Sequence, residues 1–387
     1  MPIHRTADGR YLFAIDDPAD GNSVFYDTST EPWTVLADRL SYEAGRGDPA
    51  PPPPDPPPDI IIPAPPMPTG AHIIHVTSFG DGELVNRGYS YWPQAWLETP
   101  TSAIVFCGHA DGRSRFWRVD LRSGTVVRLG ALLGYGGTGE GWYWDREGWI
   151  YLTDGPRLRR VHPFGGGDRV IFSIEESHPG CRLWQAHSSD DGTVHSATVQ
   201  RITQDGPYEN LGTVVFRAGD QLWFPAQQPL DESQVTPDGD WLVIKEGNDN
   251  RIVHIPTGHE RWIRDKEGAV GHSDCGPGFV IGEDDQHGAC VIWDLVAWTV
   301  RVLFPTWNMG HISVKGGRRL LSGPQMLSLV SLEGSLDGSA ITPVAEHGMM
   351  SDGTYDTQVF ANLDHTGRVA VFMTNRYGRL DMCVLVL

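Results

Sequence analysis

A repeat with a period of about 40 residues constrains the fold of this chain more than any other feature. Within each unit, short strands rich in Val, Ile, Trp and Phe alternate with turns that carry Asp and Gly. The clearest copies are FCGHADGRSRFWRVDLRSGTVVRLG (106–130), GWIYLTDGPRLRRVHPFGGGDRVIFSI (148–174), TPDGDWLVIKEGNDNRIVHIPTGHERWI (236–263), FVIGEDDQHGACVIWDLVAWTVRVLF (279–304) and LDHTGRVAVFMTNRYGRLDMCVLVL (363–387). A unit of this length with four strands is typical of one blade of a β-propeller.

The number of units predicts a seven-bladed ring. They lie near 89–130, 140–176, 183–228, 232–268, 269–306, 310–348 and 357–387. The last unit has room for only three strands, so we expect the segment HIIHVTS (72–78) to supply its outer strand and close the ring. Closure matters because an open ring exposes unpaired sheet edges. No helical period is sustained anywhere, which disfavours an α/β fold.

Two N-terminal segments stand apart from the repeat. Residues 48–68 read DPAPPPPDPPPDIIIPAPPMP, and proline runs of this kind form stiff linkers that cannot join a sheet interior. Residues 1–40 contain blade-like strands, so they form either an eighth blade or a small appended sheet. We therefore predict an all-β chain with an accessory segment at 1–47, a linker at 48–68 and a β-propeller at 69–387, with eight blades as the alternative.

Charge and cysteine content limit the classes of partner. The net charge is −19 with no Lys/Arg-rich run, which argues against nucleic-acid binding because phosphates require a basic face. Five scattered cysteines without a CxxC pair argue against a disulfide framework and a cysteine zinc site. We see no signal peptide and no apolar stretch of about 18 residues, so we expect a cytoplasmic protein without a membrane span.

Polar side chains recur on the strands that are expected to line the central channel. In a propeller the first strand of each blade faces this channel, and here that strand lies just before the Asp/Gly turn. The polar residues on these strands are Gln94, Gln185, His187, Gln234, His272, His311 and Gln358. Each alone is typical of a wet channel wall, but imidazoles and amides that converge on one axis indicate a ligand site. Trp184 could stack on a sugar ring or belong to the core.

The stretch from MPTGAHIIHVTSF through YWPQAWLETPTSAIVFCGHADGRSRFWRVDLRSGTVVRLG resembles the opening of oligogalacturonate lyases, which are seven-bladed propellers. GHSDC, MGHIS and the closing VFANLDHTGRVAVFMTNRYGRLDMCVLVL also stand at matching places, so the resemblance spans about residues 67–387. TolB-like propellers, which have no lyase activity, share such blade patterns. The resemblance implies a cytoplasmic enzyme that cleaves acidic, uronate-containing oligosaccharides by β-elimination with a manganese-like divalent ion.

The resemblance also implies roles for individual residues. His311 in MGHIS matches a metal-binding histidine, and Gln358 and Asp356 in TYDTQVF stand nearest to a His-Pro-His pair of the family. Oxygen donors thus replace two imidazoles there, which is a departure from the family. The implied metal ligands are His311, Gln358 and Asp356.

Three further residues are implied in catalysis. His272 in GHSDC matches an active-site histidine, and Arg251 in NDNRIVHI matches the arginine base. Lys245 stands where the family has a histidine. Because the guanidinium pKa exceeds about 12, arginine is intrinsically a poor base, and an imidazole titrates near neutrality. Either Arg251 or His272 is therefore the candidate that removes the proton at C5 of the uronate, with Gln94, Gln185, His187, Gln234 and Trp184 as candidate substrate contacts.

Two other functional classes stay open. A non-catalytic carbohydrate- or protein-binding propeller would bind a ligand without turnover and without a metal. A hydrolase would need two carboxylates about 5–10 Å apart. The candidates for such a pair are Asp274, Glu283 and Asp356, although their spacing indicates no pair.

Overall fold

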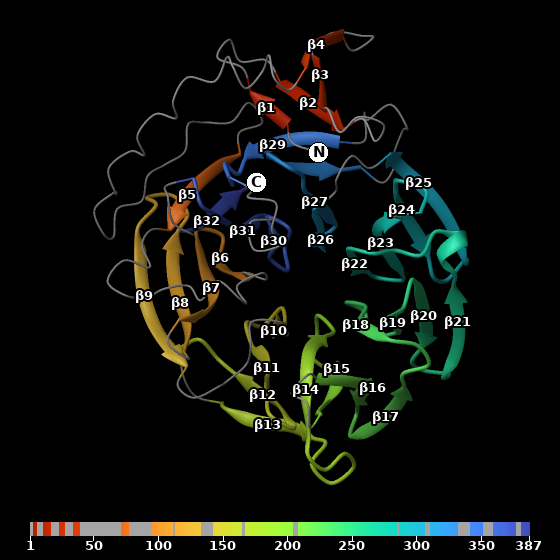
Figure 1. Cartoon of the computed structure of the whole chain (residues 1–387). Coiled ribbons are helices and arrows are strands. Elements are labelled where there is room, and N and C mark those ends of the chain that lie inside the picture. The colour runs from red at the N-terminus through yellow and green to blue at the C-terminus, as the bar shows by residue number, and fades with distance from the viewer. Residues whose placement is uncertain are drawn as a thin grey trace.

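The chain is a seven-bladed β-propeller (Figure 1). The computed structural model describes residues 3–5, 11–16, 23–27, 34–38, 71–76, 94–110, 113–132, 142–164, 167–203, 208–284, 286–305, 310–331, 341–350, 359–376 and 381–387. Within these residues the only helical element is a single 3-10 turn, η1 (Asp265–Glu267). No helix in this part of the chain is long and apolar enough to cross a membrane.

Each of the first six blades is an antiparallel sheet of four strands in chain order, and the first strand is the innermost (Figure 1). The strands of blades 1 to 3 are β6 (Gln94–Thr99), β7 (Ser102–Ala110), β8 (Arg113–Asp120), β9 (Val126–Leu132); β10 (Trp142–Trp144), β11 (Ile150–Asp154), β12 (Arg157–Val161), β13 (Arg169–Ser173); and β14 (Cys181–Ser188), β15 (Val194–Ile202), β16 (Tyr208–Arg217), β17 (Asp220–Pro225). The strands of blades 4 to 6 are β18 (Leu230–Val235), β19 (Trp241–Glu246), β20 (Asp249–His254), β21 (His259–Ile263); β22 (Ser273–Gly276), β23 (Phe279–Asp284), β24 (Ala289–Asp294), β25 (Thr299–Pro305); and β26 (His311–Lys315), β27 (Arg318–Ser322), β28 (Met326–Val330), β29 (Ile341–Glu346).

Blade 7 joins the two ends of the ring. It contains β30 (Asn362–Leu363), β31 (Val369–Thr374) and β32 (Asp381–Val386), and β5 (His72–Val76) pairs with β32 as the outer strand. The expectation that residues 72–78 close the ring is thereby confirmed. The buried side chains of His75 and Asp381 also meet across this pair, with Nε2 and Oδ2 3.2 Å apart.

The N-terminal strands form a sheet of their own. It contains β1 (Ile3–Arg5), β2 (Tyr11–Asp16), β3 (Ser23–Asp27) and β4 (Thr34–Asp38) in that order, and it shares no strand with the seven blades. The boundaries 1–47, 48–68 and 69–387 stay a prediction, and the proline tract lies outside the described residues.

The Asp/Gly turns of the sequence have a common geometry. In four blades the inner strand ends in a four-residue turn whose last residue is a glycine with positive φ, and its N–H donates to the carbonyl of the turn's first residue. These turns are 145–148, 189–192, 236–239 and 364–367. A left-handed φ is open to glycine at little cost, which explains why the repeat carries glycine at this point.

Apolar side chains pack between the blades, where they fix the ring. Separate buried clusters join blades 1 and 2, 2 and 3, 3 and 4, 4 and 5, and 5 and 6, and a larger cluster joins blades 6, 7 and 1. Along β31 the residues Val369 to Thr374 are all buried. Because the middle strands of each sheet are covered on both faces by neighbouring blades, strands such as β15 and β31 are buried along most of their length rather than at alternate residues.

Candidate functional site

A small polar cavity of about 70 Å³ lies in the central channel. Every blade contributes to it through its innermost strand or the turn that follows. The lining residues are Gln94, Ala95, Tyr143, Trp144, His187, Gln234, Ser273, Asp274, Ser313, Lys315, Asn362, Leu363 and His365. The structure therefore brings together polar groups that are far apart in the chain.

Three of the predicted substrate contacts line this cavity: Gln94, His187 and Gln234. The Gln234 side-chain NH2 donates to the Ser273 carbonyl oxygen of the next blade (3.2 Å), so this hydrogen bond links blades 4 and 5. Burial lowers the pKa of His187 to about 4, and its ring is therefore neutral at pH 7.

The other two predicted contacts, Trp184 and Gln185, are not among the lining residues. They lie where the pairing of β14 with β15 is irregular between Trp184 and His187. Gln185 has a φ of 47°, which is uncommon for a residue other than glycine. The Arg182 guanidinium lies 5.0 Å from the Trp184 ring centroid. The bulge thus turns the Gln185 side chain out of the register that the sequence pattern assumed, whereas Trp184 keeps its regular partner Thr198.

One end of the channel is crossed by an ion pair that the sequence did not reveal. Lys315, the last residue of β26, places its Nζ 3.1 Å from Oδ1 of Asp190 in the turn after β14. These residues belong to blades 6 and 3, which face each other across the ring (Figure 1). The Tyr143 hydroxyl donates to the same carboxylate oxygen (3.1 Å), and its ring lies 4.1 Å from the ammonium.

Burial disfavours charge throughout this end of the channel. It lowers the pKa of Lys315 to about 7 and raises that of Asp190 to about 6. Burial also raises the pKa of Asp274 to about 7, although the carboxylate accepts hydrogen bonds from the Val314 and Cys275 backbone N–H groups. Burial thus brings the pKa values of all three groups close to neutrality.

The predicted active-site histidines meet near the other end of the same inner strand. His311 begins β26 and Lys315 ends it, which separates them by about 13 Å. The His272 and His311 rings are stacked, with centroids 4.7 Å apart and an interplanar angle of 17°. Phe360 of blade 7 packs edge-on against His311 at 4.0 Å. His311 is 5% exposed, and burial, followed by the charges of His272 and Lys245, lowers its pKa well below the usual range.

Lys245 adds a positive charge within electrostatic range of His311. Its charge is one of the influences that lower the pKa of His311. The ammonium is partly exposed and forms an ion pair with Asp231 (3.0 Å), whose own side chain is largely exposed. The structure therefore stacks the predicted residues His272 and His311, and it places Lys245 within electrostatic range of His311.

Arg251 is held apart from this group. Its side chain is 1% exposed, and its guanidinium donates to the buried Glu246 carboxylate (2.8 Å) and to the Pro225 carbonyl oxygen of the preceding blade (3.0 Å). Lys245 pairs with Asn250 across the strands, whereas Arg251 pairs with Ile244. Because side chains alternate between the faces of a sheet, Arg251 and Lys245 point to opposite faces.

The predicted metal ligands are only partly described. His311 supplies a neutral imidazole, which is the form that binds a metal ion, and His272 lies beside it. Gln358 and Asp356 lie outside the described residues. Within the described part of the chain, no three His, Cys, Asp or Glu side chains are grouped to hold a metal ion.

Comparison with known proteins shows the fold. No protein-family model matches this chain, and neither does any curated protein. A solved oligogalacturonate lyase in complex with manganese superposes with a TM-score of 0.62 at 13% identity, over 85% of this chain and 96% of the lyase. An oligogalacturonate lyase from Vibrio parahaemolyticus gives 0.59 at 11% identity, over 84% and 97%. The Neurospora crassa Pan2 WD40 domain gives 0.53 at 10% identity, over 81% and 93%. At these identities the likeness is one of architecture, a lyase-like propeller that WD40 propellers also resemble.

Proposed function

We propose that this chain is a lyase that cleaves uronate-containing oligosaccharides by β-elimination at the group formed by His272, His311 and Lys245. The observation that carries the proposal is the stacking of two imidazoles from adjacent blades, with the Lys245 ammonium close enough to lower the pKa of one of them. Two of the similar structures are oligogalacturonate lyases, which supports the same assignment.

β-Elimination needs positive charge beside the sugar carboxylate. Removal of the C5 proton leaves an enolate-like anion, and a fixed cation next to the carboxylate stabilises it. Lys245 is the cation that the described residues offer. Its present partner, Asp231, is an exposed carboxylate, and surface ion pairs of this kind contribute only about 0–1 kcal/mol, so a substrate carboxylate can replace it.

The proton goes to His272 in this proposal. Its imidazole is half-buried and stacked on His311, whereas Arg251 is fully buried and neutralised by Glu246. As the C5–H bond breaks, the electron pair forms the C4–C5 double bond and the bond from C4 to the leaving oxygen breaks. The protonated His272 can then return the proton to that oxygen. His311, stacked on His272, fixes the orientation of its ring.

A divalent ion of the manganese kind is part of the proposal. Bound by His311 with Gln358 and Asp356, it would supply further positive charge beside the carboxylate. The channel residues Gln94, His187 and Gln234 would contact the sugar hydroxyls.

The direct test is an assay of the purified chain with and without Mn²⁺ on a panel of uronate oligosaccharides. The expected product is an unsaturated uronate, which is detected by its ultraviolet absorbance. If no absorbance develops on any member of the panel with metal supplied, the chain is not such a lyase.

One observation favours a second candidate, a non-catalytic binding propeller. The arginine expected as base is buried and held in an ion pair with Glu246. This candidate predicts oligosaccharide binding in calorimetry with no product and no bound metal in elemental analysis.

A further inference from the structure

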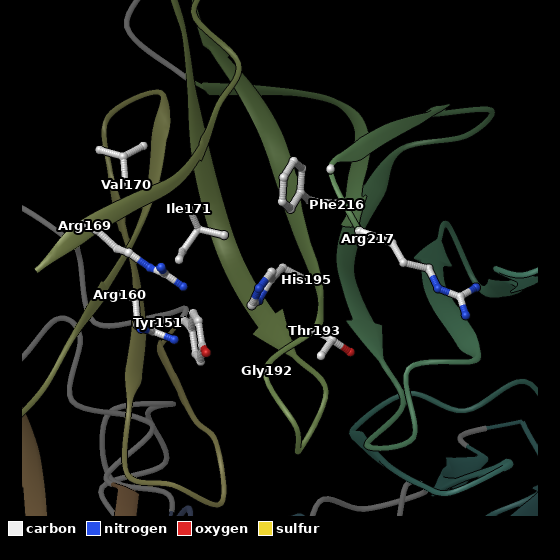
Figure 2. A pocket seen from close by; sticks show the side chains of 12 residues that line it. Tyr151, Arg160, Arg169, Val170, Ile171, Gly192, Thr193, His195, Phe216 and Arg217 are labelled. Carbon is white, nitrogen blue, oxygen red and sulfur yellow. The ribbon is translucent and has the colours of Figure 1, made fainter. Parts of the chain in front are cut away.

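A larger cavity of about 540 Å³ lies outside the channel, between blades 2 and 3 (Figure 2). It shares no lining residue with the channel cavity. Its walls are the strands β11 to β13 on one side and β15, β16 and their turns on the other. The lining residues are Tyr151, Arg160, Arg169, Val170, Ile171, Gly192, Thr193, His195, Phe216, Arg217, Ala218 and Gly219.

Two arginines face this cavity from neighbouring strands. Arg160 and Arg169 are direct cross-strand partners in β12 and β13, and Figure 2 shows both guanidinium groups on the same side of the cavity. Neither forms an ion pair with a carboxylate among the described residues. Arg159, on the opposite face of the sheet, is paired with Asp154 (3.5 Å) and Asp168 (2.8 Å). Like charges directly opposite each other destabilise a sheet. Arg159 has carboxylates that offset its charge, whereas Arg160 and Arg169 have no such counter-charge among the described residues.

Hydroxyl and imidazole groups complete the polar part of the cavity. The Tyr151 hydroxyl is fixed by donating to the buried Asp145 carboxylate (3.0 Å). His195 is 2% exposed, and its Nδ1 lies 2.7 Å from the Ser188 hydroxyl oxygen. Burial lowers the pKa of His195 to about 4, and the Arg160 charge acts in the same direction. The imidazole facing Arg160 is therefore neutral and leaves the positive charge of the cavity to the arginines.

The backbone makes room for this arrangement at Gly192. Its φ is 65°, and a Cβ there would collide with the Tyr151 hydroxyl and lie 2.9 Å from the Asp145 carboxylate. The remaining wall is apolar and includes Ile171 and Phe216, whose ring stacks on Phe172 at 4.9 Å. The Arg217 guanidinium extends away from the other two in Figure 2 and does not join them in facing the cavity.

We propose that this cavity binds a small organic anion, with a carboxylate or phosphate head between Arg160 and Arg169 and an apolar body against Ile171 and Phe216. The planar guanidinium fork matches the oxygens of either head group. The volume is within the range of about 300–1,000 Å³ that is usual for small-molecule sites. The site is independent of the proposed lyase function, because it lies outside the channel.

Isothermal titration calorimetry of the full chain with benzoate, phenyl phosphate, inorganic phosphate and benzyl alcohol tests the proposal. Benzoate or phenyl phosphate should bind, and their order of affinity identifies the preferred head group. Inorganic phosphate, which lacks the apolar body, and benzyl alcohol, which lacks the charge, should bind at least about tenfold more weakly. Equal binding of all four probes, or no binding of either aromatic anion at millimolar concentration, would overturn the proposal.

Matched variants locate the site. Arg169→Gln and Arg160→Gln should each weaken binding at least about tenfold, because each removes a charge-assisted contact. Arg157→Gln is the control, since it removes an exposed arginine of the same blade that pairs with Glu175 (3.2 Å), and it should leave the affinity unchanged. Arg169 has no ion pair to lose, so Arg169→Gln should keep the melting temperature without ligand. Wild-type affinity in both cavity variants would show that the anion binds elsewhere.

Discussion

Arg251 and Lys245 lie one strand apart in blade 4, yet their side chains point to opposite faces of the sheet. The charge of Lys245 acts on His311 of blade 6. Arg251 instead meets Glu246 of its own blade and the Pro225 carbonyl oxygen on the outer strand of the preceding blade. The residue that the family resemblance makes a base is therefore placed as a structural cation between blades.

This placement predicts that Arg251→Met acts on stability. The change leaves the Glu246 carboxylate buried without its partner, which should lower the free energy of unfolding by about 3–5 kcal/mol in urea denaturation. Glu246→Leu added to it should recover part of the loss. The control, Arg264→Met, breaks a partly exposed pair with Asp249 and should cost less than about 1 kcal/mol. A stable Arg251→Met protein that has lost turnover would instead favour the role of base.

His272→Gln should lower kcat on the uronate substrate by about 100-fold or more, because it removes the proposed proton acceptor. His254→Gln is a matched control, since His254 lies elsewhere in blade 4, bonded to the Thr257 hydroxyl and packed on Trp241. Initial rates over a range of substrate concentrations separate kcat from KM. Equal loss in both variants would contradict the assignment.

Lys245→Met and Asp231→Asn should have opposite effects on KM. The first removes the cation proposed to bind the sugar carboxylate and should raise KM about tenfold or more, since hydrogen bonds to charged groups contribute about 1.5–3 kcal/mol. The second removes the carboxylate that competes for the ammonium and should lower KM or leave it unchanged. A parallel rise in both variants would argue against substrate binding at Lys245.

Protonation of His347 should lower the stability of the fold at acidic pH. Its Nε2 donates to the Gly323 carbonyl (2.9 Å) and its Nδ1 accepts from the Met349 N–H (3.0 Å), so the ring is neutral. Burial lowers its pKa from 6.5 to about 4. The unfolded chain therefore binds more protons between these values, and stability is lost as the pH falls from 6.5 through 4. His347→Asn keeps an acceptor but does not titrate, so its slope of stability against pH should be smaller by up to about 1.4 kcal/mol per pH unit. An unchanged slope would contradict this account.

Truncation tests the predicted domain boundary. A chain that begins at residue 71 keeps β5 and should have the melting temperature of the full chain if residues 69–387 form the domain. A chain that begins at residue 78 loses β5, which exposes the edge of β32 and removes the buried Ile73, Ile74 and Val76. It should unfold at a lower temperature and aggregate. Equal melting temperatures in the two chains would show that β5 is dispensable.

The fold could be predicted from the sequence because a repeat of about 40 residues is the length of one four-stranded blade. Blades that cover each other's faces in series form a closed ring. The same reasoning placed Gln94, His187 and Gln234 in the channel, since each stands on the first strand of its unit just before a turn. It could not place Gln185, because the bulge in β14 changes the register locally.

Other parts of the site depend on the closed ring. The contact of Asp190 with Lys315 joins residues 125 positions apart in blades that only the ring brings face to face. In the sequence, only the position of each residue at the turn that follows an inner strand indicated that it could lie at the end of the channel. The orientation of Arg251 likewise depends on the pairing register of β19 with β20, and an arginine in a strand gives no indication of its face.

The pairing of β5 with β32 also determines when the ring can form. Val76 is opposite Met382, so the last contact of the ring joins segments separated by roughly 300 residues of intervening chain. During synthesis β5 therefore cannot pair until β32 has been made, which leaves its apolar residues exposed while the six intervening blades form and favours aggregation in that interval.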